Sequence, residues 1–291
     1  MTAIGRRPAP AKINLGLRVL GRRPDGYHEL DTVMAKLNLA DFIRLEPGPG
    51  PGPDGLFVTT SLSGLPPDFA SPDNLALKAA AAFRLATGWP KGAVSIFLEK
   101  HIPLGAGLGG GSADGAAVLK ALNQASPAPL ASEALARLAL SLGADVPFAL
   151  SDYHLARAGG VGERLSPAPE TFQAWAGRRL VLLNPGFPLS TALVFKNLGL
   201  TNGPSNNNLR GLEPAAELRP GANDLLPVAR RLAPVVDELV TVVSGLAPAG
   251  WGLSGSGPTF WLDTPMAAEA LTRAHPGWWA REVRVATFND S

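Results

Sequence analysis

The chain has 291 residues, of which 46% are hydrophobic and 17% charged, and its formal net charge is +2. This length predicts a large core and two domains, and so small a net charge argues against nucleic acid as a partner. No apolar run reaches the roughly 18 residues of a membrane span, the N-terminus carries no apolar signal core, and there is no cysteine. We therefore expect a cytoplasmic protein without disulfide or thiol chemistry, and no membrane partner.

Alternation of apolar and polar residues predicts strands in the first third of the chain. Strands are expected at 11–20, 27–36, 41–46, 56–62 and 94–98, with a turn at 23–26. The strands at 41–46 and 56–62 are expected to pair, because the Pro/Gly segment at 47–53 between them reads as an exposed loop tip. A helix is predicted over residues 74–86, since its apolar residues fall on one face.

The rest of the chain is predicted to mix helices and strands. Ser132 begins and Gly143 ends a predicted helix at 132–142. Beyond a glycine-rich turn at 159–162 the pattern changes, which places a domain boundary near residues 155–165. Further helices are expected at 222–246 and 265–275, and further strands at 180–184, at the end of 250–262 and at 282–288.

The most informative stretch is a glycine run followed at once by a helical pattern. Five of the seven residues from Gly105 to Gly111 are glycine. A backbone without Cβ atoms can wrap an anion closely, and a helix that starts there adds unpaired N–H groups and the positive end of its dipole. The run therefore predicts phosphate binding, and a nucleotide is the expected ligand.

The run does not fit the two common phosphate loops. Gly111 occupies the place of the lysine in a P-loop. A dinucleotide-binding fingerprint should be followed by a strand that ends in an acid, but the next segment is the predicted helix at 132–142. The protein-kinase motifs are absent. A ligand-free flexible loop is the less favoured alternative, because the strand at 94–98 and a helix frame the glycines.

Several polar and aromatic residues are candidates for chemistry, each with a plainer alternative. Lys12 lies on the polar face of the first strand, where lysines are usually only solvated. Asp145 follows a helix end, where an aspartate often makes a local turn. Tyr27 and Phe195 can serve as core packing or as stacking platforms. The glycine cluster at 252–258 is equally compatible with a second anion-contacting loop and with a tight turn.

Together these pieces resemble the GHMP kinases, small-molecule kinases whose phosphate loop lacks a lysine. Three family motifs occur in family order, at residues 10–15, 103–112 and 252–257. Within the family, residues 25–30 (Asp-Gly-Tyr-His-Glu-Leu) and 142–148 (Leu-Gly-Ala-Asp-Val-Pro-Phe) are similar to the kinase that phosphorylates a cytidine diphosphate sugar-alcohol in the non-mevalonate isoprenoid route. The resemblance runs over nearly the whole chain.

The resemblance implies an α+β fold with two domains. Residues 1–158 would form the GHMP nucleotide-binding domain, related to the second domain of ribosomal protein S5. Residues 159–291 would form a ferredoxin-like substrate domain.

The resemblance also implies roles for individual residues. Asp145 would accept the proton of the acceptor hydroxyl, and Lys12 would orient Asp145 and stabilise the developing alkoxide. Tyr27 and Phe195 would sandwich the cytosine, which His28 helps to select, while Asn14 and Thr191 would line the erythritol-phosphate side. The implied ATP-binding residues are Asn74, Lys100, Pro103, Leu104, Gly105, Ala106, Gly107, Leu108, Gly109, Gly110, Gly111, Ser112 and Ala113.

ATP is the implied phosphate donor, with Mg²⁺ as its companion, and no residue is assigned as a metal ligand. The sequence departs from many family members at Ala113, where a second serine would offer a hydroxyl to phosphate. Two alternatives remain: another GHMP kinase acting on homoserine, mevalonate or a sugar, and a non-catalytic nucleotide- or RNA-binding module. The chain is expected to be a monomer or a homodimer.

Overall fold

The computed structural model describes the whole chain except residues 51, 63–64, 200–217, 248–249 and 288–291. Its contacts divide the chain into two compact units. Unit 1 contains residues 1–11, 39–104 and 109–152, and unit 2 contains residues 12–38, 105–108 and 153–291. The units alternate along the sequence because β1 (Ile4–Arg22) and β2 (His28–Pro47) each contribute to both. The domain boundary at 158/159 stays a prediction.

Unit 1 contains part of a sheet in which β1 pairs with β2 and β4 (Val94–Lys100) lies between β2 and β3. The second half of β2 pairs with one edge of β4 in antiparallel register, and β3 (Gly55–Thr60) pairs with the other edge in parallel. The predicted pairing of 41–46 with 56–62 is therefore wrong, since β4 lies between them. Sequence proximity favours a hairpin there, but β4 uses both of its edges.

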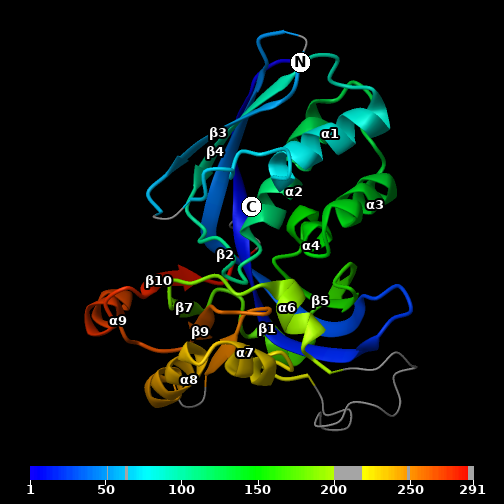
Figure 1. Cartoon of the computed structure of the whole chain (residues 1–291). Coiled ribbons are helices and arrows are strands. Elements are labelled where there is room, and N and C mark those ends of the chain that lie inside the picture. Colours follow the sequence, from blue (N-terminus) through cyan, green and yellow to red (C-terminus); the bar gives the residue numbers. More distant parts are fainter. Residues whose placement is uncertain (51, 63–64, 200–217, 248–249, 288–291) are drawn as a thin grey trace. The chain divides into compact units, whose positions relative to one another are not determined.

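The described residues of unit 1 also form four helices, and Figure 1 shows α1 and α2 along one face of its strands. They are α1 (Leu75–Thr87), α2 (Gly110–Ala125), α3 (Ser132–Leu142) and α4 (Val146–Leu150). Alternate residues of the strands, such as Ile43 and Ile96, pack against Phe83 of α1 and Val118 of α2 in one buried cluster. The helices predicted at 74–86 and 132–142 are confirmed.

In unit 2, the first half of β2 pairs with β5 (Leu155–Gly160), which in turn pairs with β6 (Arg164–Pro167), both in antiparallel register. The sequence did not reveal these two strands. The buried positions of β5 are Ala156, Ala158 and Gly160, which give only a weak hydrophobic alternation. The glycines predicted as a turn at 159–162 partly belong to β5, and the turn follows them.

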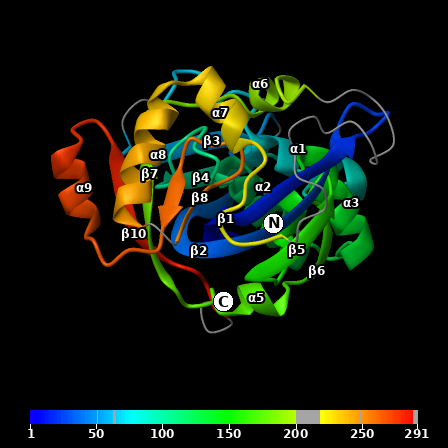
Figure 2. The same ribbon diagram turned by 90° about the horizontal axis from the view of Figure 1, so that it is seen from below.

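The second sheet of unit 2 has the antiparallel order β10-β7-β9-β8. Its strands are β7 (Arg179–Asn184), β8 (Trp251–Leu253), β9 (Phe260–Leu262) and β10 (Trp279–Arg284). Its helices are α5 (Glu170–Gln173), α6 (Thr191–Lys196), α7 (Leu226–Leu232), α8 (Val235–Leu246) and α9 (Ala268–Ala274). Figure 2 shows α8 and α9 beside these strands.

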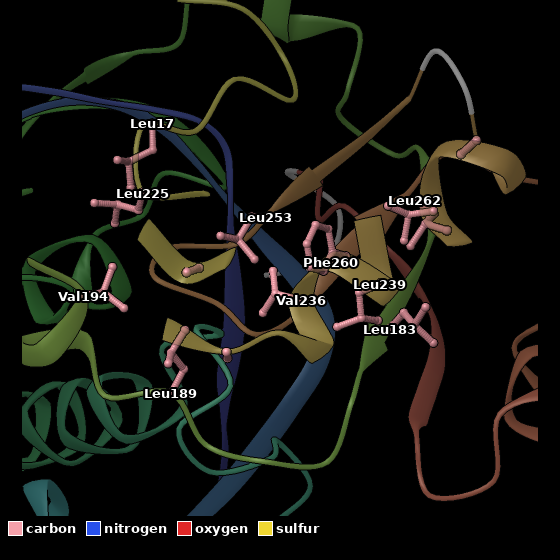
Figure 3. Close-up of a cluster of buried hydrophobic side chains, with 14 of the residues drawn as sticks. Leu17, Leu183, Leu189, Val194, Leu225, Val236, Leu239, Leu253, Phe260 and Leu262 are labelled. Atoms are coloured by element: carbon pink, nitrogen blue, oxygen red, sulfur yellow. The ribbon is translucent and has the colours of Figure 1, made fainter. Parts of the chain in front are cut away.

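The core of unit 2 lies between this sheet and its helices. Figure 3 shows Phe260 and Leu262 of β9 packed with Val236 and Leu239 of α8, and all four are fully buried. The predicted helix at 222–246 is two helices, because Pro234 interrupts the backbone pattern between them. The last strand begins at Trp279, earlier than predicted, and Phe288 lies outside the described residues. Among the described residues, none of the helices has the length and apolar character of a membrane span.

Candidate functional site

The glycine run adopts the backbone conformation that its composition predicts. Gly105, Gly107 and Gly109 have φ values of 60°, 75° and 67°, which L side chains rarely adopt. The helix α2 begins at Gly110, and its first backbone bond runs from the Ala113 N–H to the Gly109 carbonyl at 2.9 Å. The N–H groups of the preceding turn therefore lie at the helix N-terminus, where anions are favoured.

Within unit 2, residues 105–108 of the glycine run pack closely against the glycine cluster at 252–258. A Cβ on Gly107 would stand 2.3 Å from the Ser254 carbonyl oxygen. The Ser254 hydroxyl donates to the Gly107 carbonyl at 2.8 Å and accepts from the Asn14 N–H at 3.3 Å. The cluster at 252–258 is thus a support for residues 105–108 and for β1.

Lys12 is buried rather than solvated, which overturns the plainer alternative for it. Only 7% of Lys12 is exposed, and its Nζ donates to the Asn14 Oδ1 at 2.8 Å. The Asn14 Nδ2 donates to the Thr32 hydroxyl at 2.8 Å, and that hydroxyl donates to the Gly16 carbonyl at 2.6 Å. This chain of hydrogen bonds fixes the orientation of the Asn14 amide and, through it, the position of the ammonium.

Asp145 belongs to unit 1, whereas Lys12 belongs to unit 2. Asp145 immediately precedes α4, and its carbonyl accepts the Ala149 N–H at 3.1 Å. Within the part of the chain that the structure describes, its side chain does not cap this helix. Asp145 is half-buried and lies in the turn between α3 and α4, and its partnership with Lys12 stays a prediction.

The predicted base-binding residues lie in unit 2. The rings of His28 and Phe195 contact each other, with centroids 4.9 Å apart and planes inclined by 34°. Burial lowers the pKa of His28, and the charge of Arg22 lowers it further, so the ring is neutral at pH 7 and can both donate and accept. Tyr27 lies in the turn before β2 and is 63% exposed. Thr191 begins α6, and its hydroxyl lies 2.8 Å from that of Ser256.

Two predicted ATP-binding residues have structural partners in unit 1. Asn74 caps α1, because its Oδ1 accepts the Ala76 N–H at 2.9 Å. Lys100 is 1% exposed, and its Nζ contacts Asp41 and lies 2.8 Å from the Asp114 Oδ2. Their proximity to a nucleotide stays a prediction.

Sequence reasoning missed several residues that hold these groups in place. They are Thr32, Asp41, Asp114, Asn223 and Ser254. Asp41 carried a readable signal, since it is an acid inside an apolar strand, and Asp114 is an acid within the buried face of α2. Asn223, whose Nδ2 donates to the Leu253 and Gly255 carbonyls, carried none.

Comparison with known proteins assigns the family. The family model for the GHMP kinases N terminal domain matches residues 74–153. A Geobacter sulfurreducens protein called 4-diphosphocytidyl-2-C-methyl-D-erythritol kinase is 38% identical, over 95% of this chain and 97% of that protein. The chain belongs to the 4-diphosphocytidyl-2-C-methyl-D-erythritol kinase family.

Other members of the 4-diphosphocytidyl-2-C-methyl-D-erythritol kinase family agree. A crystal structure of 4-(cytidine 5'-diphospho)-2C-methyl-D-erythritol kinase has 39% identity and a TM-score of 0.71, over 96% of this chain and 99% of that one. The enzyme of the same name from Geobacter sp. strain M21 is 43% identical over 67% of this chain, but the alignment spans just under two thirds (65%) of that relative. The predicted GHMP kinase fold and family are confirmed.

Proposed function

We propose that this chain transfers the γ-phosphoryl group of ATP to the 2-hydroxyl of 4-diphosphocytidyl-2-C-methyl-D-erythritol, giving the 2-phosphate and ADP. The observation that carries the proposal is the 38–39% identity of this chain, over at least 95% of its length, to two proteins that are named as kinases of this substrate. The buried Lys12–Asn14 pair and the backbone of the glycine run supply the local chemistry that the reaction needs.

The proposed mechanism assigns proton transfer to Asp145. Its carboxylate takes the proton of the 2-hydroxyl as the oxygen bonds to the γ-phosphorus, and the bond from that phosphorus to the β–γ bridging oxygen breaks. Lys12 stabilises the negative charge that develops on the attacking oxygen, and Asn14 keeps the ammonium in place. Most of the rate enhancement comes from positioning and electrostatic stabilisation, as in other phosphoryl transfers.

The proposed ATP site is the glycine run together with the start of α2. Positive φ angles at Gly105, Gly107 and Gly109 let successive backbone N–H groups turn toward phosphate oxygens. Asn74 and Lys100 are proposed to lie near the adenine. Among the described residues there is no group of three or more His, Asp or Glu side chains suited to a metal ion. Mg²⁺ is proposed to accompany ATP and to be held mainly by phosphate oxygens and water, and no residue is assigned as its ligand.

The proposed acceptor site selects a cytidine nucleotide. Tyr27 and Phe195 stack on the base, and the neutral His28 ring supplies a hydrogen bond to its polar edge. Asn14 and Thr191 lie on the erythritol-phosphate side. We further propose that the protein is cytoplasmic, and a monomer or a homodimer.

The test of this function is a steady-state assay of ADP release with ATP and four acceptors: 4-diphosphocytidyl-2-C-methyl-D-erythritol, homoserine, mevalonate and a hexose. Turnover should require the cytidine substrate. Equal or better turnover of homoserine, mevalonate or the sugar would reject the substrate assignment. Binding of ATP without turnover of any acceptor would favour a non-catalytic nucleotide-binding module.

The role of Asp145 is tested by Asp145→Asn, which keeps the size of the side chain but removes the base. We expect kcat to fall by about 10²–10⁴-fold, while calorimetric affinities for the cytidine substrate and an ATP analogue stay near those of the parent. Asp152→Asn is the matched control, because Asp152 lies nearby in the chain and its carboxylate is 94% exposed. If Asp145→Asn turns over like Asp152→Asn, Asp145 is not the base.

A further inference from the structure

A buried cluster of three charged residues lies beside the start of α2 in unit 1. Asp41 of β2 is fully buried, and its Oδ1 accepts the N–H groups of His101 at 2.5 Å and Ile102 at 2.8 Å. Its Oδ2 accepts from the Nζ of Lys100, the last residue of β4. Asp41 thus fixes the backbone of the chain where it leaves β4 and approaches the glycine run.

The Lys100 ammonium also contacts α2, the helix that follows the glycine run. The Lys100 Nζ donates to the Asp114 Oδ2 at 2.8 Å, and Asp114 lies in the second turn of α2. Lys100 therefore links the segment before the run to the helix after it. Both carboxylates and the ammonium are at most 2% exposed, so water does not compete for these bonds.

The backbone of α2 approaches this link as closely as a glycine permits. A Cβ on Gly110 would stand 3.1 Å from the Lys100 Nζ and 3.0 Å from the Ile102 Cγ2. On another side of the helix, a Cβ on Gly115 would stand 3.2 Å from the Leu75 carbonyl oxygen. The start of α2 is thus held between α1 and the end of β4, and the spacing leaves no room for an added methyl group without a shift.

Burial of this cluster carries a large unfavourable free energy. Three buried charges cost several kcal/mol each in lost hydration, and apolar replacements of similar volume are often at least as stable. One oxygen of the cluster, the Asp114 Oδ1, is buried without a hydrogen-bond partner, which adds to the cost. Stability alone therefore does not explain why these three residues are buried together.

We propose that Asp41, Lys100 and Asp114 form a clamp that sets the distance between the two ends of the glycine run, which makes Asp114 a positioning residue for ATP. The clamp acts through the backbone, at Ile102 on one side and at the first turn of α2 on the other. It rests on the proposed function only in taking ATP as the phosphate donor. Its loss should therefore weaken ATP binding and leave the acceptor site intact.

The clamp is tested with Asp114→Ala and Asp114→Asn. Alanine breaks the link to Lys100, whereas the carbonyl oxygen of asparagine can still accept the Lys100 hydrogen bond. We expect Asp114→Ala to raise KM for ATP by about tenfold or more, the equivalent of one lost hydrogen bond to a charged group. KM for the cytidine substrate should change less than about threefold, and Asp114→Asn should restore KM for ATP to near the parent value.

Asp152→Asn serves as the control, because it removes an exposed ion pair to Lys120 on the same helix. It should leave both KM values unchanged. The proposal is overturned if folded Asp114→Ala keeps the parent KM for ATP, if it raises both KM values equally, or if asparagine restores nothing.

If the alanine variant does not fold, the same comparison is made with Asp114→Ser, whose hydroxyl is too short to reach Lys100, by calorimetric titration with a non-hydrolysable ATP analogue. A dissociation constant raised about tenfold in serine but not in asparagine supports the clamp, and equal constants overturn it. Titration needs no acceptor alcohol, so parent protein that binds the analogue but turns over a different alcohol contradicts the proposed substrate and leaves the clamp standing.

Discussion

Two of the buried lysines, Lys100 in unit 1 and Lys12 in unit 2, have different surroundings. Lys100 in unit 1 contacts the carboxylates of Asp41 and Asp114, and all three side chains are almost fully buried. Lys12 in unit 2 donates to the amide oxygen of Asn14, a neutral partner, at 2.8 Å. A carboxylate neutralises an ammonium as well as orienting it, whereas an amide only orients it.

This difference separates a structural charge from a charge that can serve chemistry. Burial lowers the pKa of Lys100, but the charges and hydrogen bonds of Asp114 and Asp41 together outweigh burial and raise it, so the proton of Lys100 is firmly held. The Asn14 amide orients the Lys12 ammonium, and an oriented cation is what an electrostatic role in phosphoryl transfer needs. The comparison therefore predicts that removal of Lys100 lowers the stability of the protein, whereas removal of Lys12 lowers its turnover.

The largest effect should follow replacement of the lysine in unit 1. Lys100→Met keeps the length of the side chain and removes the charge, which leaves two carboxylates buried beside each other. We expect the free energy of unfolding to fall by about 3–5 kcal/mol, measured by urea denaturation. Lys120→Met is the matched control, since its partner Asp152 is 94% exposed and such pairs contribute at most about 1 kcal/mol. Equal losses in the two variants would show that the cluster is not structural.

Removal of the lysine in unit 2 should act on turnover instead. Lys12→Gln should lower kcat by about 10²–10³-fold, as loss of one electrostatic stabiliser does, with the thermal midpoint reduced only slightly. Lys36→Gln controls for burial, because Lys36 is 7% exposed, the same as Lys12, and lies in the same unit. A Lys12 variant whose kcat matches that of the Lys36 variant would break the comparison.

The sequence predicted the elements around the site better than the pairing between them. The helix at 132–142 and the helix start after the glycine run follow from local signals, namely a serine start with a glycine stop and glycine flexibility, although Ser132 is the first residue of α3 and Ala131 occupies its cap position. The insertion of β4 between β2 and β3 is a tertiary arrangement that no local pattern encodes. Strand β5 was missed because its buried residues are alanine and glycine.

The candidate site divides in the same way. Glycine composition reveals a phosphate loop, and family motifs point to Lys12 and Asp145. Neither source reveals that Ser254 joins the Gly107 carbonyl to the Asn14 N–H, because that contact depends on residues about 147 and 240 positions apart. Polar residues whose partners are distant in sequence become visible only when the fold brings them together.

A third substitution tests whether residues of unit 2 select the cytidine substrate. Tyr27→Ala should raise KM for the cytidine substrate by the equivalent of about 1–3 kcal/mol of lost stacking, and KM for ATP should not change. The ring is 63% exposed, so its removal should not reduce stability. Tyr153→Ala is the control, as Tyr153 is the only other tyrosine of the chain. An unchanged KM for the cytidine substrate would remove Tyr27 from the acceptor site.

The last prediction concerns the pH dependence of stability that arises from the buried cluster in unit 1. Burial raises the pKa of Asp114 to about 7, with the charge of Asp41 adding to the rise and that of Lys100 opposing it. In the unfolded chain this carboxyl loses its proton near pH 3.8. Between these values the folded form binds a proton that the unfolded form has lost, so stability falls as pH rises through this window, by at most about 1.4 kcal/mol per pH unit.

Asp114→Asn isolates this contribution, because asparagine cannot titrate and every other group is shared with the parent. The difference in unfolding free energy, parent minus variant, should be constant below about pH 4, decrease up to about pH 7 and be constant above it. Urea denaturation of both proteins at each pH measures it. A difference that rises with pH would contradict this prediction. It would mean that Lys100 keeps Asp114 ionised, so that the carboxylate stabilises the fold at neutral pH. The attraction between Lys100 and the two carboxylates would then exceed the free-energy cost of burying their charges.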